Sequence, residues 1–312
     1  MRIAIFGATS QIAGDLILSL SIDSHNEMAL FARNVEGATN WLNEVGLSDR
    51  HPVASYAGFR ISDRFDALIN FVGVGSPKLA RAMGSSILEV TAEYDELALS
   101  YVRAHPNCRY LFLSSGASLG SIYEKPADAL SNAIVPLADL HTQDFYGVAK
   151  LYAECRHRAS STLPIVDLRV FSYFSRTQDL DSEFFLADIV KAILTKSTVK
   201  VTSDFMTRDY LGPQDFHRLV DCILRAPPQN RALDCYTLAP IEKSDLLQLM
   251  HNHFGLRFET TSASLALIPT TARKAHYYSL SRVAAEFGYM PQLTSERLIL
   301  QEVAKIVERV KS

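Results

Sequence analysis

Two side chains able to exchange protons lie four positions apart in "DFYGVAK" (Asp144–Lys150), namely Tyr146 and Lys150. Positions i and i+4 share one face of a helix, so on a helix the Lys150 ammonium would lie beside the Tyr146 phenol. A neighbouring cation favours the phenolate, and we expect it to lower the pKa of Tyr146 from its usual value of about 10. Such a tyrosine can give a proton to, or take one from, a substrate carbonyl or hydroxyl.

A segment rich in serine and glycine, "LFLSSGASLG" (Leu111–Gly120), supplies a second candidate group. Ser115 ends its apolar run and could hydrogen-bond and polarise the same substrate oxygen. The segment also contains Gly-x-Ser-x-Gly, which would make Ser118 the nucleophile of a serine hydrolase. That nucleophile needs a turn leading directly into a helix, whereas "SIYEKPADALSNAIVPLAD" follows here. Hydrolysis through Ser118 is therefore a remote alternative.

Short apolar runs that alternate with helical patterns surround these candidates. We expect strands at 2–6, 28–33, 66–73, 109–116 and 164–171, and helices at 12–21, 86–104 and around Tyr146. Uniformly apolar strands alternating with helices predict a parallel sheet covered on both faces, the doubly wound, Rossmann-type α/β fold. Ligands of such sheets bind at the carboxyl ends of the strands, where Ser115 lies.

The pattern becomes less regular after residue 171, and this change defines the expected domains. Residues 1–171 should form a dinucleotide-binding domain, to which 200–226 returns, and 172–312 should form mainly a smaller substrate-binding cap. Two late helices are expected in the cap, at 243–255 and 295–312.

The turn "GATSQIAG" (Gly7–Gly14) lies between the first strand and the first helix, where a phosphate-binding turn would be placed. Gly7 permits a tight turn, but Ser10 and Ala13 stand where further glycines are usual. Ser10 could instead offer its hydroxyl to a phosphate. On its own, the turn fits either a phosphate site or an ordinary connection.

The composition excludes several classes of protein. The chain has 312 residues, a net charge of -3 and 48% hydrophobic residues, without a basic block of the kind that binds nucleic acid. No apolar run reaches the length of a membrane span, and the start resembles no signal peptide. The four cysteines are widely spaced and no histidine pair has metal-binding spacing. We therefore expect a cytoplasmic protein that uses no metal.

The order of these motifs resembles the extended branch of the short-chain dehydrogenase/reductase superfamily, which contains nucleotide-sugar epimerases, dehydratases and ketoreductases. "SSGASLG", "LRVFSYFSR", "TRDYLGPQDFHRLVDCIL" and "YSLSRVAAEFGYMP" are each similar to a segment of that family. The resemblance implies the catalytic set Ser115, Tyr146 and Lys150. It also implies substrate contacts from Ser115, Gly116, Ser172 and Arg208, with Arg208 on the diphosphate of a nucleotide-linked sugar, and the possibility of a homodimer.

The family binds a nicotinamide dinucleotide, and Lys150 would hold its nicotinamide ribose. By resemblance, the residues expected at the cofactor are Gly7, Thr9, Ser10, Gln11, Ile12, Arg33, Asn34, Phe71, Val72, Gly73, Tyr146, Lys150 and Phe171. The second strand ends in "FARN", which lacks the carboxylate that binds the ribose hydroxyls of NAD. Arg33 suits a 2'-phosphate instead, so we expect NADP, with NAD as the alternative.

Two activities remain open within the family. Dehydratases carry Asp-Glu after the catalytic threonine, whereas Gly116 and Ala117 follow Ser115, so dehydration is disfavoured. We predict an NADP-dependent reduction of a keto group on a nucleotide-linked sugar, and the alternative is an NAD-dependent epimerase. A non-catalytic dinucleotide-binding sensor is a remote possibility, because Ser10, Ala13, Leu119 and Ser172 depart from the family pattern.

Overall fold

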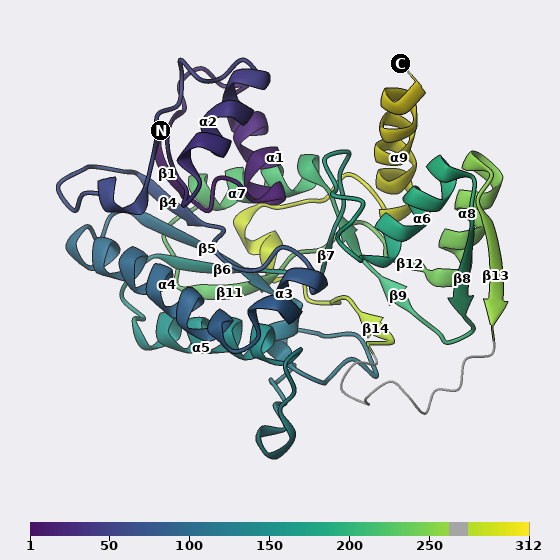
Figure 1. Ribbon diagram of the computed structural model, residues 1–312. Helices are drawn as coiled ribbons and strands as arrows, with labels where there is room; N and C mark the ends of the chain where they lie inside the picture. The colour runs from purple at the N-terminus through teal and green to yellow at the C-terminus, as the bar shows by residue number, and fades with distance from the viewer. Residues whose placement is uncertain (262–273, 312) are drawn as a thin grey trace.

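The centre of the protein is a seven-stranded parallel sheet, seen in a computed structural model that describes residues 1–261 and 274–311 (Figure 1). The strand order is β11-β6-β5-β4-β1-β2-β3. The strands are β1 (Arg2–Phe6), β2 (Glu27–Phe31), β3 (Val53–Ala54), β4 (Ala67–Asn70), β5 (Arg109–Ser115), β6 (Ile165–Val170) and β11 (Arg231–Asp234). The predicted doubly wound fold is confirmed.

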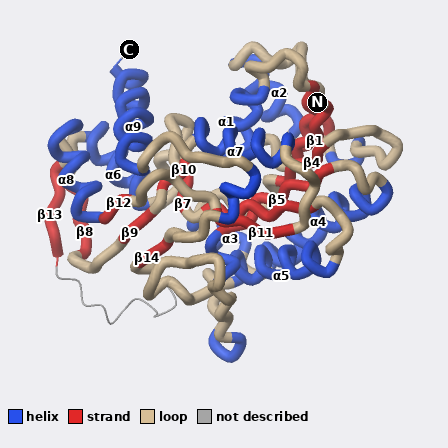
Figure 2. The backbone as a smooth tube through the Cα atoms, turned by 180° about the vertical axis from the view of Figure 1, so that it is seen from behind, coloured by secondary structure: helices blue, strands red, loops and turns tan. Residues whose placement is uncertain are grey.

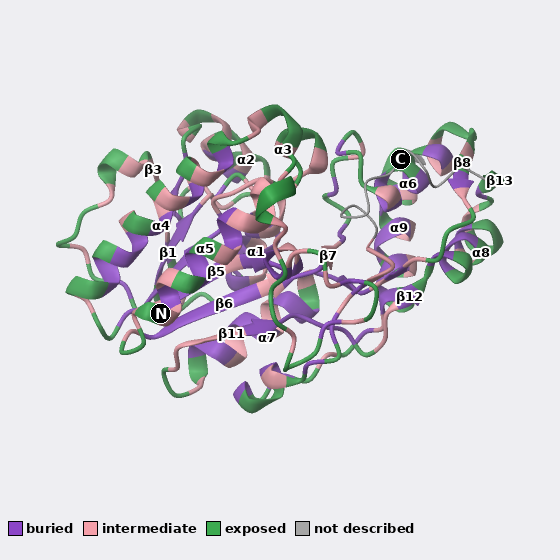
Figure 3. Cartoon of the chain, turned by 90° about the horizontal axis from the view of Figure 1, so that it is seen from below, coloured by how far each residue is buried: buried purple, intermediate pink, exposed green. Residues whose placement is uncertain are grey.

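Helices cover both faces of the sheet, as its uniformly apolar strands require (Figures 1 and 2). One layer holds α1 (Gln11–Leu20), α2 (Val35–Glu44) and α7 (Pro213–Arg225), and the other holds α4 (Ser86–Ala104) and α5 (Phe145–Ala159), with the short α3 (Pro77–Met83) beside them. Successive residues of β1 point to opposite faces. Ile3 and Ile5 join the apolar core under α1 and α7, and Ala4 and Phe6 join the core under α4. The inner strands of the sheet are accordingly mostly buried, whereas the edge strand β3 is half-buried (Figure 3).

The strand order reverses beside β1, where a doubly wound sheet opens its ligand crevice. The chain runs from β1 outward to β3 and then returns to form β4 on the other side of β1. Gly7, directly after β1, has a φ of 74°. A Cβ there would lie 2.9 Å from the Phe71 carbonyl carbon, so the turn needs glycine both for its conformation and for its approach to the chain leaving β4.

A second lobe lies beside the sheet and has its own apolar core. It contains α6 (Phe185–Thr195), α8 (Lys243–Phe254) and α9 (Ser295–Lys311), and the short strands β7 (Ser172–Tyr173), β8 (Thr198–Thr202), β9 (Thr207–Arg208), β10 (Tyr210–Leu211), β12 (Ile241–Glu242), β13 (Arg257–Thr261) and β14 (His276–Tyr277). The two late helices are found as α8 and α9, and Ser312 lies outside the described residues. None of the described helices is both long and apolar enough to cross a membrane.

The segment that rejoins the central sheet differs from the expected 200–226. α7 packs against α1, and β11 pairs with β6, so the returning segment spans 213–234. β8 instead pairs with β13 in the second lobe. Because β11 is only four residues long, its pattern was too short to identify from the sequence.

A buried charge cluster fixes α5 to the sheet. His157 of α5 lies 2.7 Å from Asp95 of α4 and 2.5 Å from Asp167 of β6, and all three side chains are fully buried. Burial opposes the imidazolium, but the two carboxylates outweigh it and raise the pKa of His157 to about 9. The helix that carries Tyr146 and Lys150 is therefore tied to both neighbouring elements by charge-assisted hydrogen bonds.

Candidate active site

Tyr146 and Lys150 lie in the first two turns of α5, at the carboxyl edge of the sheet. Lys150 is buried, and its Nζ donates to the carbonyl oxygens of Leu113 at 2.7 Å and Val72 at 3.4 Å. The same Nζ lies 5.9 Å from the centre of the Tyr146 ring. The expected neighbouring pair is therefore present, with the ammonium directed at the ends of β5 and β4.

Ser115 ends β5 and faces Tyr146. Its Oγ accepts the backbone N–H of Ala117 at 3.1 Å, which caps the short 3-10 helix η2 (Gly116–Leu119). The Ser115 Oγ also lies 3.1 Å from the hydroxyl of Tyr277. Three hydroxyl groups, from Ser115, Tyr146 and Tyr277, thus meet at the edge of the sheet.

The predicted lowering of the Tyr146 pKa is wrong for this arrangement. Burial raises the pKa of the Tyr146 phenol well above its usual value, and Tyr277 raises it further, while a hydrogen bond with Ser115 opposes the rise. The Lys150 ammonium, 5.9 Å from the centre of the Tyr146 ring, does not offset the effect of burial. Burial also lowers the pKa of Lys150 to about 8, against the carboxylates of Asp95, Asp167 and Glu154.

The glycine turn after β1 leads into the N-terminus of a helix. The ten-residue helix α1 begins beyond Gly7, and Ser10 caps it by accepting the Ala13 N–H at 3.3 Å. A helix N-terminus with a close glycine turn suits a pyrophosphate. At the other end of the crevice, a Cβ on Gly73 would lie 3.1 Å from the Lys150 Nζ. The turn, the end of β4 and Lys150 thus border one space.

Some of the expected cofactor residues already have partners. Gln11 donates from Nε2 to the Ser175 Oγ at 3.0 Å, and the Asn34 Oδ1 caps α2 by accepting the Gly37 N–H at 2.9 Å. Arg33 is exposed and has no hydrogen bond or ion pair within the described residues. Of the remaining expected residues, Thr9 is exposed, Ile12 packs against the core, Val72 lies at the end of β4, and Phe71 and Phe171 are buried.

Two half-buried cations, Arg208 and Lys274, lie against the ring of Tyr277. Arg208, on β9, donates from Nη1 to the carbonyls of Thr207, at 2.9 Å, and Lys274. Neither Arg208 nor Lys274 forms an ion pair in the part of the chain that the structure describes. Burial lowers the pKa of both, that of Lys274 to about 8, although the Asp144 carboxylate in the same pocket opposes the fall for Lys274. Desolvated cations of this kind favour an anionic ligand.

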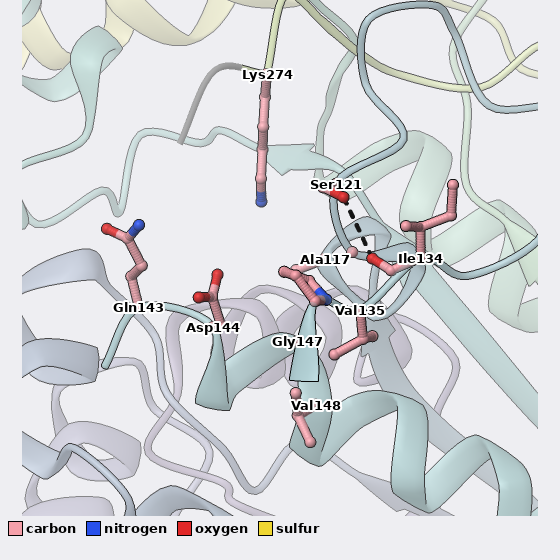
Figure 4. A pocket seen from close by; sticks show the side chains of 11 residues that line it. Ala117, Ser121, Ile134, Val135, Gln143, Asp144, Gly147, Val148 and Lys274 are labelled. Atoms are coloured by element: carbon pink, nitrogen blue, oxygen red, sulfur yellow. Dashed lines mark hydrogen bonds between the residues drawn. The ribbon is translucent and has the colours of Figure 1, made fainter. Parts of the chain in front are cut away.

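Lys274 points into a pocket at the start of α5 (Figure 4). Ala117 and Gly147 form its floor, and the segments around Ser121 and Ile134 form one wall. A Cβ on Gly147 would lie 2.4 Å from the Ala117 carbonyl oxygen, so η2 and α5 meet closely here. The pocket therefore lies at the first turn of α5, which also carries Tyr146.

The other two expected substrate residues take different positions. Gly116 lies beneath the ring of Phe171, where a Cβ would be 2.5 Å from the Phe171 Cδ1, so this position excludes a side chain. Ser172 is half-buried on β7. This strand pairs with β10, which begins two residues after Arg208 in the chain.

Ser118 is buried, and its Oγ has no hydrogen-bond partner within the described residues. It lies in η2, and no histidine activates it. The geometry gives no support to a serine hydrolase, because that nucleophile must be exposed and bonded to a base.

Sequence reasoning missed Tyr277 and Lys274. Tyr277 is separated from Ser115 by 162 positions, and it reaches the site because β14 pairs with β9, with Tyr277 opposite Arg208. A strand of two residues has no periodicity, so no local signal could have identified them.

The fold and the side chains at its ligand edge define a short-chain dehydrogenase/reductase of the extended type. The model of the NAD dependent epimerase/dehydratase family matches residues 3–238, and the chain belongs to this family. No curated protein sequence matches the chain significantly.

Solved structures of this family share the fold at low sequence identity. A UDP-glucuronic acid 4-epimerase variant from Bacillus cereus, in complex with a UDP-sugar analogue and NAD, aligns with a TM-score of 0.79 at 14% identity, covering 99% of this chain and 100% of its own. The UDP-glucose 4-epimerase of Thermotoga maritima with UDP-glucose gives 0.79 at 15% identity, covering both chains fully. The dTDP-glucose 4,6-dehydratase of Bacillus anthracis with NAD gives 0.77 at 13% identity, covering 99% and 97%.

Proposed function

We propose that the protein is an epimerase that acts on a nucleotide-linked sugar through a bound nicotinamide dinucleotide. The observation that carries the proposal is the meeting of Ser115, Tyr146 and Lys150 at the carboxyl edge of the sheet, beside two half-buried cations, Arg208 and Lys274, that form no ion pair within the described residues. Ser115, Tyr146 and Lys150 together can perform proton transfer at a sugar hydroxyl, and the two cations can bind a diphosphate.

The side chains divide the chemistry among them. A nicotinamide dinucleotide, held in part by Lys150, would supply a hydride acceptor for the sugar carbon and would allow the hydride to return to the opposite face of that carbon. Tyr146 takes the proton of the sugar hydroxyl and gives it back, and Ser115 donates a hydrogen bond to the same oxygen. Lys150 would move from the carbonyls of Leu113 and Val72 to the ribose, and its charge near the phenol would then lower the pKa of Tyr146.

The reductase favoured by the sequence now ranks second. The family and the solved relatives named above support the alternative, an epimerase with NAD. An epimerase restores its cofactor in each cycle, whereas a reductase consumes it.

Incubation with UDP-glucose, UDP-N-acetylglucosamine or UDP-glucuronic acid and a trace of NAD tests the proposal. Chromatography should show two epimers approaching equilibrium with no net change in nicotinamide absorbance. Stoichiometric consumption of NADPH with a keto sugar nucleotide, and no epimer, would instead establish the reductase. Turnover of neither kind, in a protein that binds the nucleotides, would make the protein a sensor.

A substitution of Arg33 tests which dinucleotide the protein prefers. The Arg33 guanidinium is exposed and has no hydrogen bond or ion pair in the part of the chain that the structure describes, and the tip of β2, "FARN", carries no carboxylate to repel a 2'-phosphate. We expect wild type to bind NADPH at least as tightly as NADH. Arg33→Asp should weaken NADPH by roughly ten- to a hundredfold, because it removes a charged contact and adds a repulsive one. The same variant should tighten NADH by supplying an acceptor for the ribose hydroxyls.

Fluorescence titration of both reduced cofactors provides the measurement, and Arg257→Asp, an identical charge change on β13, is the control. The loss in Arg33→Asp should shrink as salt rises, because an exposed contact is screened. Wild type that binds NADH far more tightly than NADPH would disprove a role for Arg33 at a 2'-phosphate.

A further inference from the structure

Tyr277 occupies a position that the catalytic set of Ser115, Tyr146 and Lys150 does not explain. Its hydroxyl lies 3.1 Å from the Ser115 Oγ, although the two residues are 162 positions apart. The ring is buried edge-on against Tyr123 and Phe171, with centroid distances of 4.8 and 5.3 Å. The Lys274 Nζ lies 4.4 Å from the ring centre on the substrate side.

The scaffold around Tyr277 holds it there. The His276 N–H donates to the Tyr123 carbonyl at 3.0 Å, and the Ala127 N–H donates to the Tyr278 carbonyl at 3.0 Å. Two residues after Tyr277, the Ser279 Oγ donates to Asp234 at 2.6 Å.

The Asp234 carboxylate connects the segment of Tyr277 to α5, the helix that carries Tyr146 and Lys150. Asp234 lies 3.5 Å from Arg169, which binds both carboxylate oxygens of Glu154 on α5. Ser114, the residue before Ser115, donates to Glu154 at 2.5 Å. The segment of Tyr277 and the helix of Tyr146 are thus joined by one buried polar chain.

The number of hydrogen bonds that the Ser115 hydroxyl can donate and accept determines the role of Tyr277. A serine hydroxyl has one hydrogen and two lone pairs. The Ala117 N–H occupies one lone pair at 3.1 Å. If Tyr277 donates into the other, the only capacity left to Ser115 is its own hydrogen. Ser115 must then donate that hydrogen toward Tyr146 or toward the reacting oxygen of the substrate, as catalysis requires.

We propose that Tyr277 is a positioning residue that donates its phenolic hydrogen to Ser115 and so fixes the Ser115 hydroxyl as a hydrogen-bond donor to the reacting oxygen. This inference rests on the proposed function. Burial raises the pKa of Tyr277, so its phenol remains protonated and able to donate at neutral pH.

Tyr277→Phe tests the role, because it removes the hydroxyl and keeps the ring against Tyr123 and Phe171. We expect kcat to fall roughly five- to thirtyfold with little change in KM, as the loss of one hydrogen bond that acts in the transition state predicts. In a Ser115→Ala background the same change should cost nothing further, since its target is gone. Tyr278→Phe, the identical change at the next residue, is the matched control and should leave kcat unchanged.

Thermal unfolding of wild type, Tyr277→Phe, Ser115→Ala and the double variant measures the hydrogen bond independently of activity. The two substitutions should be coupled, with the double variant's unfolding midpoint higher than the sum of the single shifts predicts. Additive effects on kcat, or a rise in KM alone, would show that Tyr277 contacts the substrate directly and would overturn the proposal. A wild-type protein without turnover would overturn the proposed function, and the unfolding cycle would still decide whether Tyr277 holds Ser115.

Discussion

Tyr146→Phe is expected to reduce turnover by about a hundredfold or more while leaving the fold and cofactor binding intact. The substitution removes only the hydroxyl to which the proposed function assigns proton transfer. The ring and its contact with the Lys150 ammonium remain, and α5 remains held through His157 by Asp95 and Asp167. Steady-state rates on the sugar nucleotide, together with fluorescence titration of the cofactor, measure the two effects separately.

Tyr152→Phe is the matched control for this experiment. Tyr152 lies on the same helix, but it is more than half exposed, and the Arg156 guanidinium lies over its ring. This variant should retain wild-type rates. Near-complete activity in Tyr146→Phe, with loss in Ser115→Ala, would assign proton transfer to a group other than Tyr146.

The sheet and its helices could be predicted because their signal is local. α4 begins and ends where expected, and β1 spans the predicted residues, because each is a continuous run whose apolar period matches its geometry. The Tyr-x-x-x-Lys spacing likewise fixes which face of α5 carries the pair. A helix of fifteen residues leaves little freedom for their relative position.

Tyr277 and Lys274 could not be predicted, because their side of the site is assembled from pieces too short to have a pattern, and Arg208 was identified only through the family resemblance of its segment. β9, β12 and β14 have two residues each and come from three distant parts of the chain. The direction of the pKa shift of Tyr146 could not be predicted from the sequence either. Spacing shows that Lys150 is near, but only the structure shows that the ammonium turns toward Leu113 and that burial dominates the pKa.

Burial also gives Arg208 its importance. The guanidinium lies over the Tyr277 ring at 5.5 Å, and one of its nitrogens is held by two main-chain carbonyls. Those contacts orient the remaining N–H groups without neutralising the charge. A guanidinium that is desolvated and has no carboxylate partner binds a phosphate more strongly than one already paired.

Arg208→Ala is therefore expected to weaken binding of a nucleoside diphosphate or its sugar conjugate by roughly 2–4 kcal/mol. Arg208→Lys should recover only part of that loss, since an ammonium keeps the charge but cannot bind two oxygens in one plane. Isothermal titration calorimetry with UDP measures both variants, and Arg257→Ala, an exposed arginine on β13, is the control.

Cofactor binding distinguishes loss of a ligand contact from loss of structure. The Arg208 Nη1 supports the carbonyl of Lys274, so truncation could displace the segment that carries Tyr277. The dinucleotide crevice beside β1 lies outside that segment and should bind cofactor normally in Arg208→Ala. Equal affinity for UDP in wild type and Arg208→Ala would mean that the anion meets Lys274 alone, or that the substrate carries no diphosphate. A parallel loss of cofactor binding would instead make Arg208 a structural residue.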